Sequence, residues 1–326
     1  MKHRLAFWLA ILVGVLAFPY RSPAPLVYRA DEGWVYEKPG EDKGWQKPRA
    51  KDQIQVAEDA FTAKKYSLAG RAAQRVVKMW PFSDYAPQAQ YLVGRCYEAQ
   101  GKDEKAFQHY QKVLEKYPKM TNAQDVLERE LIIANKFLGG KWRKLWGYIP
   151  IPPSQDKTVE MYEKIVKVAP YSTVAPQAQM NIGAAREKQK NYAQAVKAYE
   201  RTADKYAERE PIASDALYKA GLASLKQSKT ADYDQNAAGN AISTFSDFAA
   251  LHPDDKRIPE TQKRIEELKT EQARGAYMVA KFYEKKKKWS GALIYYNEVL
   301  VKDPNCKFAA EARQRITDIK KRVEAK

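Results

Sequence analysis

The stretch PQAQYLVGRCYEAQGKDEKAFQHYQKVLEKYP, residues 87–118, decides the fold of this chain. Counted from its first residue, Gly94, Ala106, Tyr110 and Pro118 take positions 8, 20, 24 and 32. Two helices of a hairpin approach most closely at positions 8 and 20, so only glycine or alanine fits there, and an aromatic ring at position 24 fills the groove. Proline at position 32 ends the second helix, because it lacks an N–H and disfavours helix in the residue before it.

The same spacing recurs along the chain, and its 34-residue frame is that of the tetratricopeptide repeat, a helix–turn–helix unit. Matching residues define four more units: Ala57, Ala69 and Pro81; Gly183, Ala195 and Tyr199; Gly221, Ala241, Phe245 and Pro253; and Ala280, Ala292, Tyr296 and Pro304. The unit that contains Gly221 has eight extra residues in its turn. No long run of alternating apolar and polar residues is present, so strands are not expected.

One further unit is interrupted by an insertion. Helical patterns at 121–137 and 157–168 flank LGGKWRKLWGYIPIPPSQ, an insertion of 18 residues. The sequence therefore predicts an all-α fold, a superhelical array of about six helix hairpins (an α-solenoid), two of them with turn insertions.

A repeated phrase marks two equivalent units. YAPQAQY at 85–91 returns as VAPQAQM at 174–180, 89 residues later. Proline in the first turn followed by glutamine and alanine is typical of a helix start. Each phrase is therefore predicted to begin the first helix of a hairpin.

The predicted organisation has three parts. Lys2, His3 and Arg4 precede the apolar run LAFWLAILVGVLAF at 5–18, which reads as a secretory signal core and is short for a membrane-spanning helix. Residues 1–24 are therefore expected to be a signal peptide, or a retained N-terminal anchor, and to direct the chain out of the cytoplasm. Residues 25–50, rich in proline, glycine and aromatics, are an extended linker, and residues 51–326 form the helical array with the insertion at 138–156.

Composition argues against an enzyme. Three scattered histidines and two cysteines provide no metal-ligand spacing, and no nucleophile elbow, P-loop or glycine-rich nucleotide turn is present, so no catalytic, cofactor or metal site is expected. The two cysteines, Cys96 and Cys306, can form a disulfide or serve as small buried residues. The net charge is +17, but the basic residues alternate with acidic ones, which favours solvated helix faces, and no nucleic-acid-binding signature accompanies them.

Stacked hairpins of this type bind partners along a groove lined mainly by their first helices. The frame places six residues there: Phe61, Tyr91, Arg95, Tyr218, Tyr277 and Lys281. Tyrosine and arginine are frequent anchors at protein interfaces. Each aromatic residue can equally belong to the core between repeats, so both roles remain open.

The last unit carries a family resemblance. RGAYMVAKFYEKKKKWSGALIYYNEVLVKDPNCKFAAEA, residues 274–312, resembles the closing repeat of the BamD (YfiO, ComL) family. The matching residues are Val279, Ala280, Phe282, Tyr283, Lys285, Lys286, Ala292, Val299 and Pro304. FSDFAALHPDD at 245–255, preceded by Ala241 and Ile242, is similar to a second phrase of that family, and the resemblance covers roughly residues 52–320.

The resemblance implies a periplasmic scaffold of the outer-membrane β-barrel assembly machinery, associated with the outer membrane and without catalytic residues. Its partners would be the barrel-assembly subunit and unfolded outer-membrane proteins. The N-terminal repeats, with Phe61, Tyr91 and Arg95, would face substrate. Tyr277, Lys281 and the run Lys285–Lys288 would face the partner subunit, although four lysines also suit a solvated turn. The alternative is another periplasmic repeat scaffold, such as a cell-division or envelope-integrity coordinator.

Two features depart from the family. Val15 stands where the family has its lipidated cysteine, so attachment is expected through partners, an uncleaved signal or another segment. The insertion places Trp142 and Trp146 among cations at 141–149. Such a segment suits a membrane surface, a protein groove or a cover over the solenoid itself, and a carbohydrate-binding or enzymatic role in the cell wall is a further alternative.

The frame makes a prediction about Ala106. Replacing Ala106 with leucine should overpack the hairpin and lower the free energy of unfolding by about 1–3 kcal/mol. Thermal or chemical denaturation measures the loss. An unchanged stability would mean that the frame of this unit is out of register.

Overall fold

The computed structural model describes residues 26–29, 33–36, 44–120, 122–140, 143–145, 149–151, 154–230 and 235–324. Most of them are helical, which confirms the all-α class. The chain divides into two compact units, residues 1–127 and 128–326, and the division falls inside α6 (Ala123–Leu138). The predicted signal or anchor at 1–24 lies outside the described residues.

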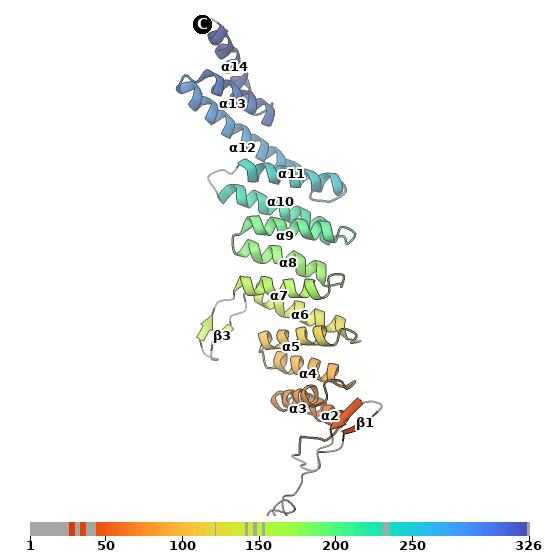
Figure 1. Ribbon diagram of the computed structural model, residues 1–326. Coiled ribbons are helices and arrows are strands. Elements are labelled where there is room, and N and C mark those ends of the chain that lie inside the picture. Colours follow the sequence, from red (N-terminus) through yellow and green to blue (C-terminus); the bar gives the residue numbers. More distant parts are fainter. Residues whose placement is uncertain are drawn as a thin grey trace, which may run out of the picture. The chain divides into compact units, whose positions relative to one another are not determined.

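The first unit contains two complete hairpins (Figure 1). Their helices are α2 (Ala50–Thr62), α3 (Tyr66–Met79), α4 (Ala86–Ala99) and α5 (Asp103–Lys116). Each helix packs against the next one in the chain. A core of small residues and a few large ones, among them Ala57, Ala69 and Trp80, joins the first three helices.

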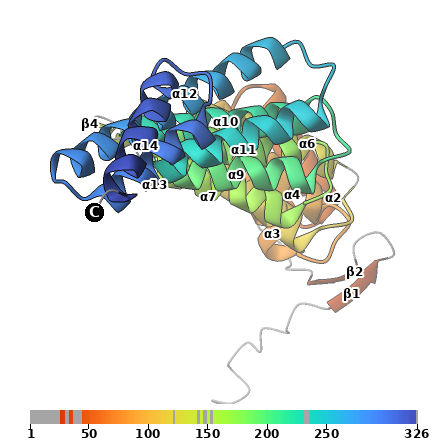
Figure 2. The same cartoon turned by 90° about the horizontal axis from the view of Figure 1, so that it is seen from above.

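The second unit continues the same pattern from the end of α6. Its helices are α7 (Gln155–Val168), α8 (Ala175–Lys188), α9 (Tyr192–Lys205), α10 (Ile212–Thr230), α11 (Gln235–Leu251), α12 (Ile258–Lys285), α13 (Trp289–Lys302) and α14 (Ala309–Glu324). From α7 onward each helix packs on its successor. Helices α7 to α11 follow one another in Figure 1 and overlie one another in Figure 2.

The predicted close approach within each hairpin is present. A Cβ atom added to Gly94 would lie 2.4 Å from the ring of Tyr110, and one added to Gly183 would lie 2.4 Å from the ring of Tyr199. The same addition at Gly221 would lie 2.6 Å from Phe245. The ring at position 24 therefore rests directly on the glycine at position 8, and a side chain at position 8 has no room.

The ring at position 24 is also fixed by its hydroxyl group. Tyr110, Tyr199 and Tyr296 each donate a hydrogen bond to a glutamate twelve residues earlier, at 2.5, 2.7 and 2.5 Å. Tyr162, in the hairpin that carries the insertion, donates to Asn135 at 2.6 Å. A fully buried phenol needs such a partner, and the first helix of the same hairpin supplies it.

The turn between the two helices of a hairpin uses one left-handed residue. Gly101 has φ of 71°, and the corresponding residues Lys64, Lys190 and Lys287 have φ of 59°, 59° and 57°. Only glycine adopts this region without steric strain. The lysine run at 285–288 is therefore the turn between α12 and α13, which is the solvated role left open above.

The repeated phrase begins two helices, as predicted. Helix α4 begins at Ala86 and helix α8 at Ala175, each with proline in the first turn. Proline is tolerated there because its missing N–H has no partner in a helix anyway.

Helix α12 is longer than the repeat frame predicts. The frame starts the last unit near Arg274, whereas the helix begins at Ile258 and runs unbroken to Lys285. Ile265 and Leu268, in the added part, are buried with α10 and α11. Ala276 and Ala280 are buried with α13 and α14. The first half of α12 therefore packs on the hairpin of α10 and α11, and its second half forms the next hairpin with α13, because apolar residues at helical spacing continue through the expected boundary.

Two short strand pairs lie in the segments predicted as linker and insertion. Strands β1 (Leu26–Arg29) and β2 (Gly33–Tyr36) pair antiparallel, as do β3 (Arg143–Leu145) and β4 (Ile149–Ile151). Strands of three or four residues are too short to show an alternating pattern in the sequence. The end of the linker lies against the first hairpin: Gln53 donates to the carbonyl oxygen of Trp45 at 3.2 Å, and Arg71 lies over its ring at 5.6 Å.

The glycine–ring contact yields a double-mutant prediction. Gly94→Ala should lower the free energy of unfolding by about 1–3 kcal/mol, because the new methyl group meets the buried Tyr110 ring. Combining it with Tyr110→Ala should give a loss smaller than the sum of the single losses, because the methyl group then has no ring to meet. The first hairpin has buried alanines, Ala57 and Ala73, at the two corresponding positions. Urea denaturation of the four proteins measures the coupling.

The matched control is Gly70→Ala in the middle of α3. An added Cβ there would lie 3.5 Å from the Cβ atom of Cys96, an ordinary contact. Helix propensity then dominates, and stability should be unchanged or rise by up to about 1 kcal/mol. Additive losses at Gly94 and Tyr110 would contradict the proposed contact.

Candidate partner-binding surfaces

Three of the predicted binding residues meet in the first unit. Arg95 lies with its guanidinium carbon 5.5 Å from the centre of the Phe61 ring and 5.7 Å from that of Tyr91. Its Nη1 donates a hydrogen bond to the Tyr91 hydroxyl at 3.1 Å. All three side chains are half-buried. The first helices of two successive hairpins, α2 and α4, therefore bring one cation and two aromatic rings to one place.

Tyr91 has a further polar partner, and another hydrogen bond joins the same two helices. The Tyr91 hydroxyl donates to the carboxylate of Asp125 on α6, and Gln88 donates to Glu58 on α2. Burial raises the pKa of Glu58, and the neighbouring Asp59 raises it further. We call the following residues the first-helix cluster: Glu58, Phe61, Gln88, Tyr91, Arg95 and Asp125. Its exposed ring edges and charged groups can contact aromatic, acidic or backbone groups of a bound chain.

Tyr218 occupies a different environment. It is 9 % exposed, in the core of α10, α11 and α12. The Arg257 guanidinium lies 4.8 Å from its ring centre and pairs with Asp215 and Asp255, each at 2.6 Å. The hydrogen bond from Arg257 lowers the pKa of Asp255 to about 2. Tyr218 therefore has the core role that the sequence left open. Arg257 precedes α12, between two repeat frames, so no spacing rule marks it.

Tyr277 is likewise in a core, and helix α14 covers it. The ring is 6 % exposed and stacks on Phe308, with ring centres 4.8 Å apart. Lys281 lies over the same ring at 5.2 Å and 3.9 Å from a carboxylate oxygen of Glu311 on α14. The Lys281 side chain remains 51 % exposed. Of Tyr277 and Lys281, therefore, only Lys281 has a side chain exposed enough to contact a partner.

The remaining two candidates, Trp142 and Trp146, lie outside the described residues. They flank β3, which pairs with β4 within the insertion. Their role as a binding or membrane-contacting pair stays a prediction.

On the second-helix side of the first unit, a histidine fills the space between helices. Gln90, 4 % exposed, donates through Nε2 to the backbone oxygen of His109 at 3.2 Å and lies 2.9 Å from its Nδ1. The imidazole stacks on Tyr97, with ring centres 5.1 Å apart. Burial, together with Lys112 and Lys105, lowers the pKa of His109 to about 4. A neutral ring therefore satisfies a buried amide here.

Both cysteines are free thiols. Cys96 is buried in the core of the first unit, and Cys306 is partly buried. Burial raises the pKa of Cys96 to about 11, so it is unreactive near neutral pH. Within the described ranges no helix is both long and apolar enough to cross a membrane. The same residues contain no group of three or more histidine, cysteine, aspartate or glutamate side chains suited to hold a metal ion.

The fold and its surfaces define a helix-hairpin repeat scaffold, and family comparisons agree. Residues 88–119 match the family model described as tetratricopeptide repeat. Residues 154–302 match the YfiO model, described as outer membrane lipoprotein. The resemblance read from the last repeat is thus confirmed over most of the second unit. Both are scaffold families whose members mediate protein–protein interactions, and neither is an enzyme family.

Solved structures to which this chain is similar include a tetratricopeptide-repeat protein from Cytophaga hutchinsonii, at 17 % identity over 81 % of this chain and 87 % of that one, with a TM-score of 0.36. Another is from Parabacteroides merdae, at 13 % identity over 82 % and 98 %, with a TM-score of 0.33. A third, YrrB, is described as having an unusual peptide-binding site and matches at 14 % identity over 66 % and 92 %, with a TM-score of 0.34. No curated protein gave a match.

The neutral His109 predicts a pH dependence of stability. Its pKa in the folded chain, about 4, lies below the ordinary value of 6.5, so the unfolded chain takes up the proton first as the pH falls. The stability that the neutral ring contributes is fully present above pH 6.5, and it is lost as the pH falls from 6.5 to about 4. Because the ring is partly exposed, we expect a loss of about 1–2 kcal/mol.

Denaturation of the native chain and of His109→Gln, from about pH 7 to about pH 4.5, measures this contribution. The native chain should lose more stability than the variant over that range. Parallel curves would show that His109 is not the group responsible.

Proposed function

We propose that this chain is an exported scaffold of outer-membrane β-barrel assembly, located in the periplasm beside the outer membrane. The observation that carries the proposal is the YfiO family match, which spans residues 154–302 and therefore α7 to α13. The predicted export signal at the N-terminus agrees with an envelope location. The partners would be the barrel-forming subunit and unfolded outer-membrane proteins.

The two units would have different tasks. The first-helix cluster offers a guanidinium group between two partly exposed rings, which suits the backbone and aromatic side chains of an unfolded substrate. In the second unit, Met278 and Phe282 on α12 are each 57 % exposed and lie on the same helix as Lys281. This apolar pair with its cation would contact the partner subunit, while Tyr277 supports it from the core.

A second candidate is an envelope scaffold with another task, such as coordination of cell division or envelope integrity. Val15, in the position of the family's lipidated cysteine, favours it. In that case the hairpins would bind a different set of periplasmic proteins through the same kind of surface.

Photo-crosslinking in living cells distinguishes the two candidates. A photoreactive amino acid in place of Lys281 should form an adduct with a barrel-assembly subunit, identified by mass spectrometry. The matched control is the same substitution at Val301 on α13, which is 78 % exposed. We expect the adduct from position 281 to exceed that from position 301 by about tenfold. Adducts with cell-division or cell-wall proteins alone would remove the barrel-assembly proposal.

A further inference from the structure

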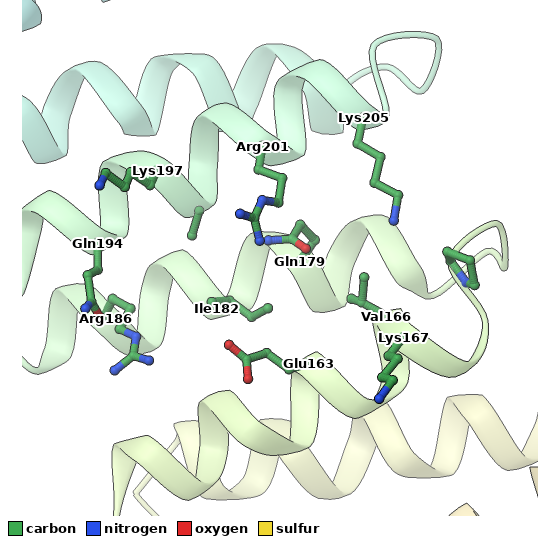
Figure 3. Close-up of a pocket in the computed structure, with 12 residues that line it drawn as sticks. Glu163, Val166, Lys167, Gln179, Ile182, Arg186, Gln194, Lys197, Arg201 and Lys205 are labelled. Carbon is green, nitrogen blue, oxygen red and sulfur yellow. The ribbon is translucent and has the colours of Figure 1, made fainter. Parts of the chain in front are cut away.

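A cavity of about 570 Å³ opens between the second helices α7 and α9, with α8 as its floor (Figure 3). We call it the α7–α9 cavity. Five cations and one carboxylate line it, namely Lys167, Arg186, Lys197, Arg201, Lys205 and Glu163. Figure 3 shows these side chains around the space, with Gln179 and Arg201 near its middle.

The corresponding place in the first unit is occupied by two stacked rings. The 89-residue offset of the repeated phrase relates Gln90 to Gln179, Tyr97 to Arg186 and His109 to Ala198. In the first unit the stacked rings of Tyr97 and His109 occupy this place. In the second unit a methyl group replaces the imidazole and an arginine replaces the phenol. Two substitutions on a common framework have therefore removed the rings that fill the space.

The change leaves the side chain of Gln179 at the cavity. Gln179 is 4 % exposed and lines the cavity, and its side chain makes no hydrogen bond to any described residue. In the first unit Gln90, equally buried, donates to His109. The amide of Gln179 is open to the cavity, so a ligand there can accept from it as the backbone oxygen of His109 accepts from Gln90 in the first unit.

The charges around the cavity specify an anion. Lys167, Lys197 and Arg201 form no ion pair with any described residue, whereas Arg186 is paired with Asp156 at 3.0 Å. Lys197, Arg201 and Lys205 recur every four residues along α9, so their backbone positions span about 12 Å. A single phosphate group cannot reach both ends of such a row. Alternate residues of an extended peptide lie about 6.6–6.8 Å apart, so three alternating carboxylates match its length.

We propose that the α7–α9 cavity binds an acidic, extended peptide segment of a protein partner. One side chain of the segment enters the cavity and accepts a hydrogen bond from Gln179. Further carboxylates pair with Lys197, Arg201 and Lys205. Single-stranded nucleic acid is disfavoured, because no aromatic side chain lines the cavity for stacking. This assignment rests on the proposed function as a protein-binding scaffold and adds the chemistry of one partner segment.

Fluorescence anisotropy with the full chain tests the proposal. The probe is a labelled, capped heptapeptide with glutamate at alternate positions, and the matched probe carries glutamine instead. The glutamate peptide should bind and the glutamine peptide should not. Ala198→His, which restores the residue found in the first unit, should weaken binding about tenfold. Arg201→Gln, at an exposed position that leaves folding intact, should do the same.

The control is Lys112→Gln, which removes the cation related to Arg201 by the 89-residue offset. It should change the affinity by less than about twofold. Equal weakening by Lys112→Gln and Arg201→Gln would overturn the proposal, because binding would then follow overall charge. Preference for inorganic phosphate, or for phosphatidylglycerol vesicles, over the peptide would overturn it as well.

Failure of this inference is distinguishable from failure of the proposed function. Capture of a barrel-assembly subunit from position 281, together with no peptide binding, would remove the cavity assignment alone. Peptide binding that responds to Ala198→His and Arg201→Gln, together with capture of other envelope proteins, would remove the barrel-assembly role and keep the site.

Discussion

The contact between a glycine at position 8 and an aromatic ring at position 24 is the constraint on which the hairpins depend. Without a Cβ atom at Gly94, Gly183 or Gly221, the ring of the second helix lies directly on the backbone of the first. The phenol then reaches a glutamate one turn further along the first helix, at Glu98 and Glu187. One small residue thus sets the distance between two helices and positions a buried hydrogen bond. Surfaces made by neighbouring helices inherit their geometry from it.

The sequence predicts those features that recur. Small residues, rings and prolines at fixed intervals are visible without a structure, so the hairpins and the helix starts at Ala86 and Ala175 could be predicted. The long α12 could not, because residues 260–274, which join two repeat frames, are helix-forming and include no proline or glycine, and the helix then continues through Gly275. Helical spacing also cannot distinguish a groove residue from a core residue. Arg95 remains half-buried, whereas Tyr277 is buried against Phe308 and α14, which lie beyond the repeat pattern.

Surface chemistry was less predictable, because it depends on where repeats differ. Ala198 alone indicates no site in the sequence. Its importance is seen only by comparison with His109, the residue at the equivalent position 89 residues earlier. The stacked imidazole in the first unit shows what the framework holds when it is filled, and Gln179 shows what remains when the rings are absent. The first unit therefore contains, within the same chain, the filled form of the site that the second unit leaves open.

The net charge of +17 likewise does not show that neighbouring grooves of the second unit carry opposite charges. The groove next to the α7–α9 cavity, between α9 and α11, has the opposite character, since Asp204, Glu210, Asp247 and Asp254 line it. Helix α9 contributes cations to one groove and Asp204 to the other. A segment that crosses both would be held in one direction, with its acidic part over the cavity and its basic part over the acidic groove. Alternating charge along the second helices can thus select both the orientation of a partner segment and the sign of its charge. Like charges that meet across an interface oppose binding.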